Sequence, residues 1–290
     1  MTRSPVYDPI ATRPRDWREH QADLADFASA TVPYPLLFAT ISGADLYGFP
    51  SADGDYDIRA THVLPLRKMI VAPLHGASWY RMSGATVEKS QEHIALLIDL
   101  VSHDIGKALH LALKGNGYVL EQILSPLVLV TTAWHEELRE IAQGCITRRV
   151  YYHYRGFFTG QQKLYNKAGD KRVKGLLYQY RVAMTGIVAL ETGEIEANVL
   201  RLNERFHLPG VEELVARKVS GERTCVENDA PYLREIASLE PRLDEAYERS
   251  ALPDRTPSEV WAAAEDFLFR CRLAVRQVGN LSYTEGMGKE

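Results

Sequence analysis

The chain has 290 residues, of which 46% are hydrophobic and 25% are charged, a balance typical of globular proteins with one large domain or two of ordinary size. Its net charge of −4 excludes a protein that is basic throughout, and three widely spaced cysteines without a CxxC pair argue against a disulfide framework or a cysteine-bound zinc site. The sequence shows neither a signal-peptide core nor an apolar run long enough to span a membrane, so we expect a cytoplasmic protein without a membrane partner.

The first half of the chain predicts a small mixed α/β unit. The run from Pro35 to Ile41 is continuously apolar, as expected of a strand that is buried on both faces. Ser102 or Asp104 can cap the helix IGKALHLALK, and Gly115 can take the left-handed position that ends it. In chain order we expect a helix over 16–30, strands over 35–41, 56–63 and 93–101, and helices over 105–114 and 119–124.

The second half predicts helices without strands. Apolar residues recur at helical spacing over 135–145, 149–167, 174–191, 212–218 and 257–278. The change of character places a seam between Pro126 and Ala142, so the expected domains are 1–130 and 131–290.

A cluster of aspartates follows the first predicted strand. The stretch SGADLYGFPSADGDYDIRA, residues 42–60, holds Asp53, Asp55 and Asp57. On a strand, residues two apart face the same way, so Asp55 and Asp57 are expected to present two neighbouring carboxylates. Like charges so close are unfavourable without a counter-charge. A divalent cation such as Mg²⁺ (or Mn²⁺), which proteins hold with one or two carboxylates and substrate phosphate oxygens, would supply it.

Three interpretations of these aspartates compete. The first is a solvated acidic turn, because Asp and Gly cluster in turns for conformational reasons. The second, a calcium-binding loop, fails because Ile58 stands where the loop needs glycine and Leu64 where it needs glutamate. The third is a Mg²⁺-dependent phosphoryl or nucleotidyl transfer site, which needs a glycine turn upstream and a third carboxylate downstream.

Both features required by the third interpretation are present. Gly43 and Gly48 follow the buried strand, where backbone N–H groups can approach a phosphate. Asp99 lies inside the apolar run IALLIDLV, where a carboxylate is costly unless it is paired or binds a metal. Asp99 is therefore either a third metal ligand or a core carboxylate paired with Arg59 or Lys107.

The run from Gly43 to Ala60 resembles a motif of the DNA polymerase β-like nucleotidyltransferase superfamily, in which a Gly-Ser turn precedes D-x-D and a later strand adds a third carboxylate. It is most similar to the RNA-repair-associated polymerase β-like group, whose motif reads approximately G-S-x-x-Y-G-x-x-x-x-x-S-D-x-D-x-R-G. The later block KGNGYVLEQILSP, residues 114–126, also resembles that group. The resemblance extends over residues 35–185 and weakens beyond them.

The resemblance implies an α+β fold, with a small mixed-sheet nucleotidyltransferase core followed by a helical C-terminal domain. It implies an enzyme that moves a nucleoside monophosphate from a nucleoside triphosphate, with ATP expected, to a hydroxyl or phosphate acceptor, an RNA end among them. The implied catalytic and metal-binding residues are Asp55, Asp57 and Asp99. The implied nucleotide-binding residues are Ser42, Gly43, Tyr47, Gly48, Arg59, Lys174 and Arg181.

Three positions depart from the motif. Ala44 replaces the turn serine, Gly54 replaces the serine before the first catalytic aspartate, and Ala60 replaces the glycine that ends the motif. Loss of the turn hydroxyl favours a non-catalytic nucleotide or RNA sensor that kept the fold, whereas retention of three carboxylates favours an enzyme. A metal-dependent phosphohydrolase is the other alternative. The sequence determines neither the acceptor nor the oligomeric state.

A basic and aromatic segment occupies the start of the helical half. Between Cys145 and Arg181 there are nine Lys or Arg residues and a single acid, Asp170, with aromatic residues between them. Such a segment is either a solvated helix face with aromatics in the core or a surface suited to triphosphate contact, base stacking or a nucleic-acid backbone. Lys174 and Arg181 are the two cations that the resemblance matches to nucleotide contacts.

Overall fold

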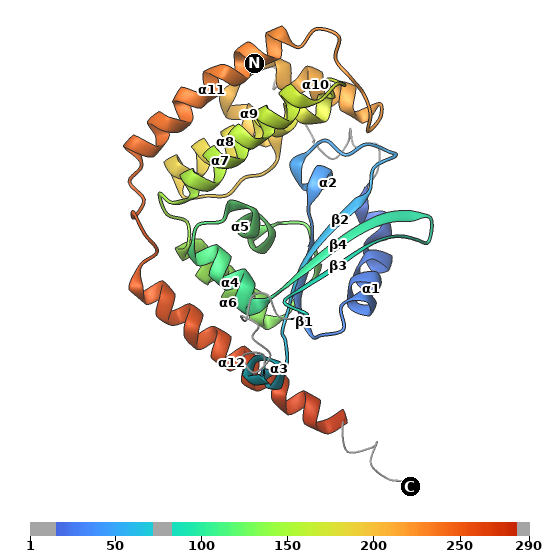
Figure 1. The fold of residues 1–290 in the computed structure, drawn as a ribbon, viewed down its shortest axis with the longest axis vertical. Coiled ribbons are helices and arrows are strands. Elements are labelled where there is room, and N and C mark those ends of the chain that lie inside the picture. The colour runs from blue at the N-terminus through green and yellow to red at the C-terminus, as the bar shows by residue number, and fades with distance from the viewer. Residues whose placement is uncertain (1–15, 72–82, 283–290) are drawn as a thin grey trace, which may run out of the picture.

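The computed structural model describes residues 16–71 and 83–282. Its first half is built around a five-stranded sheet of order β3-β4-β2-β1-β5 (Figure 1). Strands β2 and β4 are parallel and the other neighbours are antiparallel, so the sheet is mixed. The strands are β1 (Leu36–Ile41), β2 (Tyr56–His62), β3 (Thr86–His93), β4 (Leu96–Asp104) and β5 (Val128–Val130).

Helices flank the sheet and make up the rest of the regular secondary structure in the described chain. Those of the first half are α1 (Gln21–Thr31), α2 (Gly43–Tyr47), α3 (Leu66–Val71), α4 (Ile105–Leu113) and α5 (Gly117–Leu124), with a 3₁₀ turn over Trp17–His20. Those of the second half are α6 (Ala133–Gly144), α7 (Val150–Lys167), α8 (Val173–Thr192), α9 (Val199–Phe206), α10 (Pro209–Val219), α11 (Ala230–Arg249) and α12 (Ser258–Ser282). The chain thus has the expected α+β fold, with a mixed sheet followed by helices.

The helices form two groups (Figure 1). Helix α1 lies on one side of the sheet, and α4, α5 and α6 lie on the other. Helix α8 is the centre of the second group, because it packs against α7, α9, α10 and α11 and is buried along most of its length. One apolar core runs through both groups, and the domain boundary near residue 130 stays a prediction.

Helix α12 returns to the first half and packs against α3, α4 and α6. Its buried Arg272 donates hydrogen bonds to both carboxylate oxygens of Asp104, at 2.7 Å and 2.5 Å. Asp104 also accepts a hydrogen bond from the backbone N–H of Gly106, which confirms it as the N-cap of α4. Gly115 has a φ of +73°, which confirms its left-handed conformation. Within the residues that the structure describes, no helix combines the length and apolar character that crossing a bilayer requires.

Several elements differ from the sequence-based expectations, and α2, α3 and β5 are among those that were not predicted. The strand expected over 93–101 corresponds to β4, which begins only at Leu96 because a turn at Ile94 and Ala95 separates it from β3. Strand β3 escaped prediction because its central residues are exposed and polar, without apolar alternation. Helices α9 and α11 were not predicted either, and α11 carries Pro241 in its interior, where proline argues against a helix.

Candidate functional site

Parallel pairing of β2 with β4 brings two of the predicted carboxylates together. Asp57 on β2 is the register partner of Asp99 on β4. Both meet the guanidinium of Arg59, whose Nη2 lies 2.8 Å from Oδ1 of Asp57 and 3.2 Å from Oδ2 of Asp99. Asp57 and Arg59 are two residues apart on β2 and therefore share a face of the sheet. The structure thus shows Asp99 paired with Arg59, and its role as a metal ligand stays a prediction.

Arg59 is held from several directions at once. Its Nε donates to the hydroxyl of Tyr118 at 2.6 Å, and its Nη1 donates to the carbonyl oxygens of Ile58 and Asp99 at 3.0 Å and 3.1 Å. The second oxygen of Asp99 accepts a hydrogen bond from the hydroxyl of Ser90 on β3. A planar guanidinium with all three nitrogens engaged has little rotational freedom. The carboxylate pair is therefore oriented before any ligand binds.

Gly43 is required by the way Asp57 packs. Its φ is +57°, and a Cβ built on it would lie 1.7 Å from Oδ2 of Asp57. The backbone N–H of the preceding Ser42 donates to the carbonyl oxygen of Asp57 at 2.8 Å. The first turn of α2 therefore lies directly against this carboxylate, and any side chain at position 43 would displace it.

The electrostatics of Asp57 favour a cation. Burial raises the pKa of its carboxyl group above the ordinary value, and the nearby Asp55 and Asp99 raise it further, while Arg59 and Lys174 oppose the shift. A carboxylate in these surroundings keeps its negative charge at a free-energy cost, which additional positive charge would offset.

Asp55 lies at the edge of this group. It precedes β2 and is exposed in the turn, so the expectation that Asp55 and Asp57 project from one strand is wrong. Lys174 lies near enough to Asp55 for the two charges to interact. Among the described residues, no three His, Cys, Asp or Glu side chains come together as a metal site. The expected three-carboxylate site is therefore not assembled in this arrangement.

The carboxylate pair nevertheless suits a hard divalent cation. Asp57 and Asp99 provide oxygen ligands, which Mg²⁺ and Mn²⁺ prefer. Oδ1 of Asp57 and Oδ2 of Asp99 lie 2.8 Å and 3.2 Å from Nη2 of Arg59, so the two carboxylates are close enough to share one cationic group. Because position 43 is glycine, the Asp57 carboxylate fits against the first turn of α2, where any side chain would displace it.

Glu222, in the turn after α10, ties the aspartate loop to the helical half. Its carboxylate accepts hydrogen bonds from Lys174 Nζ at 2.6 Å, Lys218 Nζ at 2.5 Å and Ser51 Oγ at 3.1 Å. Its backbone N–H donates to Oδ1 of Asp53 at 3.0 Å. Glu222 could not be predicted as part of the site, because nothing in the neighbouring sequence distinguishes it from other glutamates in loops. Lys218 on α10 was not predicted either, because lysine is seldom fully buried as it is here.

The pKa of Glu222 makes its role testable by pH. Burial would raise this pKa, but hydrogen bonds from Lys174 and Lys218 outweigh burial and lower it to about 2. The stabilisation is therefore fully present above the ordinary glutamate value and is lost as pH falls toward 2. We expect Glu222→Gln to lower the free energy of unfolding by about 2 kcal/mol at pH 7, because buried Lys218 loses its counter-charge.

Denaturant unfolding of wild type and Glu222→Gln between pH 7 and pH 3 measures this effect. The difference between the two proteins should shrink as pH falls. Glu212→Gln is the matched control, since Glu212 is an exposed glutamate on the same helix, α10. A constant difference across the pH range would contradict the ion-pair role of Glu222.

Three of the other residues matched to nucleotide binding, Ser42, Tyr47 and Gly48, are packed inside the fold. Ser42 is buried, and its hydroxyl does not cap α2. Gly48, at φ +87°, is the left-handed C-cap of α2 and packs against Asn198. The ring of Tyr47 is buried, with the guanidinium carbon of Arg181 3.9 Å from its centroid. All three residues are buried in this arrangement.

Arg181 is the clearest correction. Its side chain is 0% exposed, and its Nη1 donates to Oε1 of Glu121 at 2.9 Å. The same oxygen accepts a hydrogen bond from the hydroxyl of Tyr154 at 3.2 Å. A guanidinium enclosed in this way cannot touch a bound nucleotide, so the expected contact is wrong for this arrangement. Lys174, by contrast, is partly exposed beside the aspartates.

Comparisons with known proteins agree with the motif. A profile of the RNA repair pathway DNA polymerase beta family, RlaP, matches residues 18–270. The chain is 34% identical over 232 residues to the uncharacterized protein MJ0002 of Methanocaldococcus jannaschii, covering 77% of this chain and 88% of that protein. It is 29% identical over 150 residues to the uncharacterized protein YcgL of Bacillus subtilis, covering 50% and 53% respectively.

Among solved structures, a nucleotidyltransferase-like protein from Exiguobacterium sibiricum matches with a TM-score of 0.30 and 10% identity, covering 87% of this chain and 79% of that one. The profile match extends over both the aspartate motif and the block at residues 114–126, and so confirms the resemblance drawn from them. The chain belongs to the RNA repair pathway DNA polymerase beta family.

Proposed function

We propose that this protein transfers a nucleoside monophosphate from a nucleoside triphosphate, with ATP as the expected donor, to a hydroxyl or phosphate acceptor. An RNA end is the acceptor that the family's description favours. The observation that carries the proposal is the pairing of Asp57 and Asp99 on adjacent parallel strands around one cationic group. In the reaction, the acceptor oxygen forms a bond to the α-phosphorus, the bond from that phosphorus to the β-phosphate oxygen breaks, and pyrophosphate leaves.

Asp57 and Asp99 are the residues that would hold Mg²⁺ or Mn²⁺, with Asp55 at the adjoining turn. When bound, such ions neutralise triphosphate charge and lower the pKa of an attacking hydroxyl. Asp99, oriented by Ser90 and Arg59, is the carboxylate that we assign to accept the proton of the acceptor hydroxyl. Lys174 supplies positive charge for the departing pyrophosphate.

Lys174 tests the nucleotide side of this proposal. Burial would lower its pKa, but the hydrogen bond to Glu222 and nearby Tyr178 and Asp55 raise it, so the ammonium stays charged at neutral pH. We expect Lys174→Ala to weaken triphosphate binding about tenfold, the loss of one charge-assisted hydrogen bond. Because its side chain is 37% exposed, the free energy of unfolding should change by less than about 1 kcal/mol.

Calorimetric titration of ATP into wild type and Lys174→Ala across a salt series measures this effect. Lys163→Ala is the matched control, since Lys163 is an exposed cation on the same basic segment. Equal weakening by both variants would assign the effect to overall charge, and unchanged affinity in Lys174→Ala would remove Lys174 from the site.

The transfer reaction itself is tested by pyrophosphate release. Wild type with ATP, Mg²⁺ and a mixture of RNA ends should release pyrophosphate, and a chelator should stop it. A non-catalytic nucleotide sensor is the second candidate, because Ala44 stands at the turn position and the neighbouring Ser42 hydroxyl is buried. Tight ATP binding without pyrophosphate release from any acceptor would support the sensor and contradict the transferase.

A further inference from the structure

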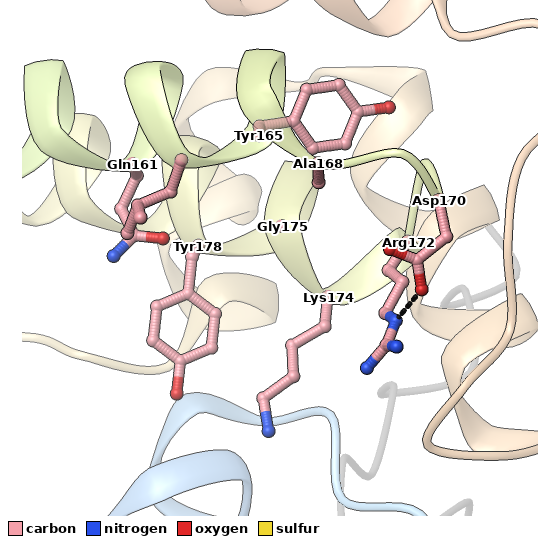
Figure 2. A pocket seen from close by; sticks show the side chains of 9 residues that line it. Gln161, Tyr165, Ala168, Asp170, Arg172, Lys174, Gly175 and Tyr178 are labelled. Carbon is pink, nitrogen blue, oxygen red and sulfur yellow. Dashed lines mark hydrogen bonds and ion pairs between the residues drawn. The ribbon is translucent and has the colours of Figure 1, made fainter.

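A pocket of 340 Å³ lies where the end of α7 meets the start of α8. Figure 2 shows its lining, with Gln161 and Tyr165 from α7 and Lys174, Gly175 and Tyr178 from α8. Of these residues, only Lys174 was matched individually to a nucleotide contact. Leu164, Tyr165, Ala168 and Tyr178 give the lining apolar surface, which suits a flat apolar ligand. The ion pair of Arg172 with Asp170 also lines the pocket.

The two aromatic walls of this α7/α8 pocket are fixed in place. The hydroxyl of Tyr165 donates to Asp229 at 3.0 Å, and Gly175 lets its ring approach α8, since a Cβ there would lie 2.8 Å from the ring. The ring of Tyr178 packs edge-on against Tyr47 and Phe49, with centroids 5.6 Å and 5.9 Å apart. Tyr165 is 4% exposed and Lys171 Nζ lies 4.7 Å from its ring centroid, so the partly buried Tyr178 is the ring that offers stacking surface to a base.

Lys174 connects the pocket to the carboxylates. It lines the pocket, and its charge acts on both Asp55 and Asp57. Its side chain extends from α8 toward the α2 segment, as does that of Tyr178 (Figure 2). A ligand that places phosphates between Lys174 and the aspartates would therefore have its remaining part beside the pocket.

We propose that the α7/α8 pocket binds the base of the nucleoside triphosphate and that Gln161 determines which base is preferred. The inference rests on the proposed function, whose site it extends. The Gln161 amide offers both donors and acceptors, which is what recognition of a base edge needs. The apolar wall beside it is Leu164, whose side chain is 63% exposed.

The test compares ATP with inorganic tripolyphosphate, both with Mg²⁺, as ligands of the full-length protein in calorimetry. Leu164→Trp fills the pocket from an exposed position, so folding should be unaffected. We expect it to weaken ATP binding at least about tenfold while tripolyphosphate affinity stays within about twofold. Phe269→Trp, at another exposed apolar position on α12, is the control and should change neither.

Base preference gives an independent measurement. Gln161→Ala should change the ratio of ATP to GTP affinity at least about fivefold, with tripolyphosphate unchanged. If Leu164→Trp binds ATP as tightly as wild type, or if Gln161→Ala keeps the ratio of ATP to GTP affinity, the pocket assignment is overturned. The proposed transfer reaction is not affected by either result. Selective loss of ATP binding in Leu164→Trp would support the pocket assignment even if no transfer reaction is found. A wild type that binds ATP no better than tripolyphosphate would overturn it as well.

Discussion

Asp57→Asn should abolish nucleotidyl transfer, with a loss of at least about 10³-fold, while leaving the fold intact. The substitution removes one charge from the carboxylate pair and with it a ligand for a divalent cation. The folded-state pKa of Asp57 is raised, so its charged form costs folding free energy at neutral pH. Its contribution to stability is present below the ordinary aspartate pKa and is lost as pH rises through the raised folded value.

The metal-free Asp57→Asn protein should therefore be as stable as wild type or more stable at pH 7. The measurement is a pair of melting curves in chelator together with the transfer rate in Mg²⁺. Asp26→Asn, at an exposed position on α1, is the matched control and should match wild type in both. A fall in melting temperature of several degrees for Asp57→Asn would show that Asp57 serves chiefly as the ion-pair partner of Arg59.

Arg181→Ala should have the largest effect on stability, lowering the free energy of unfolding by about 3–5 kcal/mol. Arg181 is fully buried against Glu121, and removing one partner of such a pair leaves the other charge without compensation inside the core. Denaturant unfolding measures the loss. The double variant Arg181→Met with Glu121→Gln should recover much of it, because both charges are then gone.

The same variants separate a core role from a ligand contact. Binding of ATP at a temperature where Arg181→Ala remains folded should be close to that of wild type. Normal stability together with lost ATP affinity would instead return Arg181 to the nucleotide site.

The carboxylates of the candidate site could be predicted from the sequence, because charged residues in these positions need a local chemical reason. Three aspartates behind a buried strand and one in an apolar run are costly placements that predict a positively charged partner, and Arg59 is the partner that Asp57 and Asp99 share. The pairing of the strands could not be predicted from the sequence. The parallel pairing of β2 with β4 is what places Asp57 beside Asp99. The start of β2 at Tyr56 also decided that Asp55 lies in the turn.

The helical contribution could not be predicted to the same depth. Lys174 and Arg181 are seven residues apart on α8, a spacing that puts both on one helix face. Tyr47 covers Arg181 and leaves Lys174 partly open, and this difference comes from packing between distant segments. Glu222 meets Ser51 across 171 positions of sequence, which no local pattern records.

The most direct test of the central claim follows the two ends of the triphosphate separately. Wild type is incubated with Mg²⁺, RNA ends and ATP labelled at either the α- or the γ-phosphate. We expect the α-label to become covalently attached to an acceptor while the γ-label leaves as pyrophosphate. Neither product should form with Asp57→Asn or Asp99→Asn. Release of α-label as free monophosphate, or of γ-label as inorganic phosphate, would indicate hydrolysis and contradict a nucleotidyl transfer site.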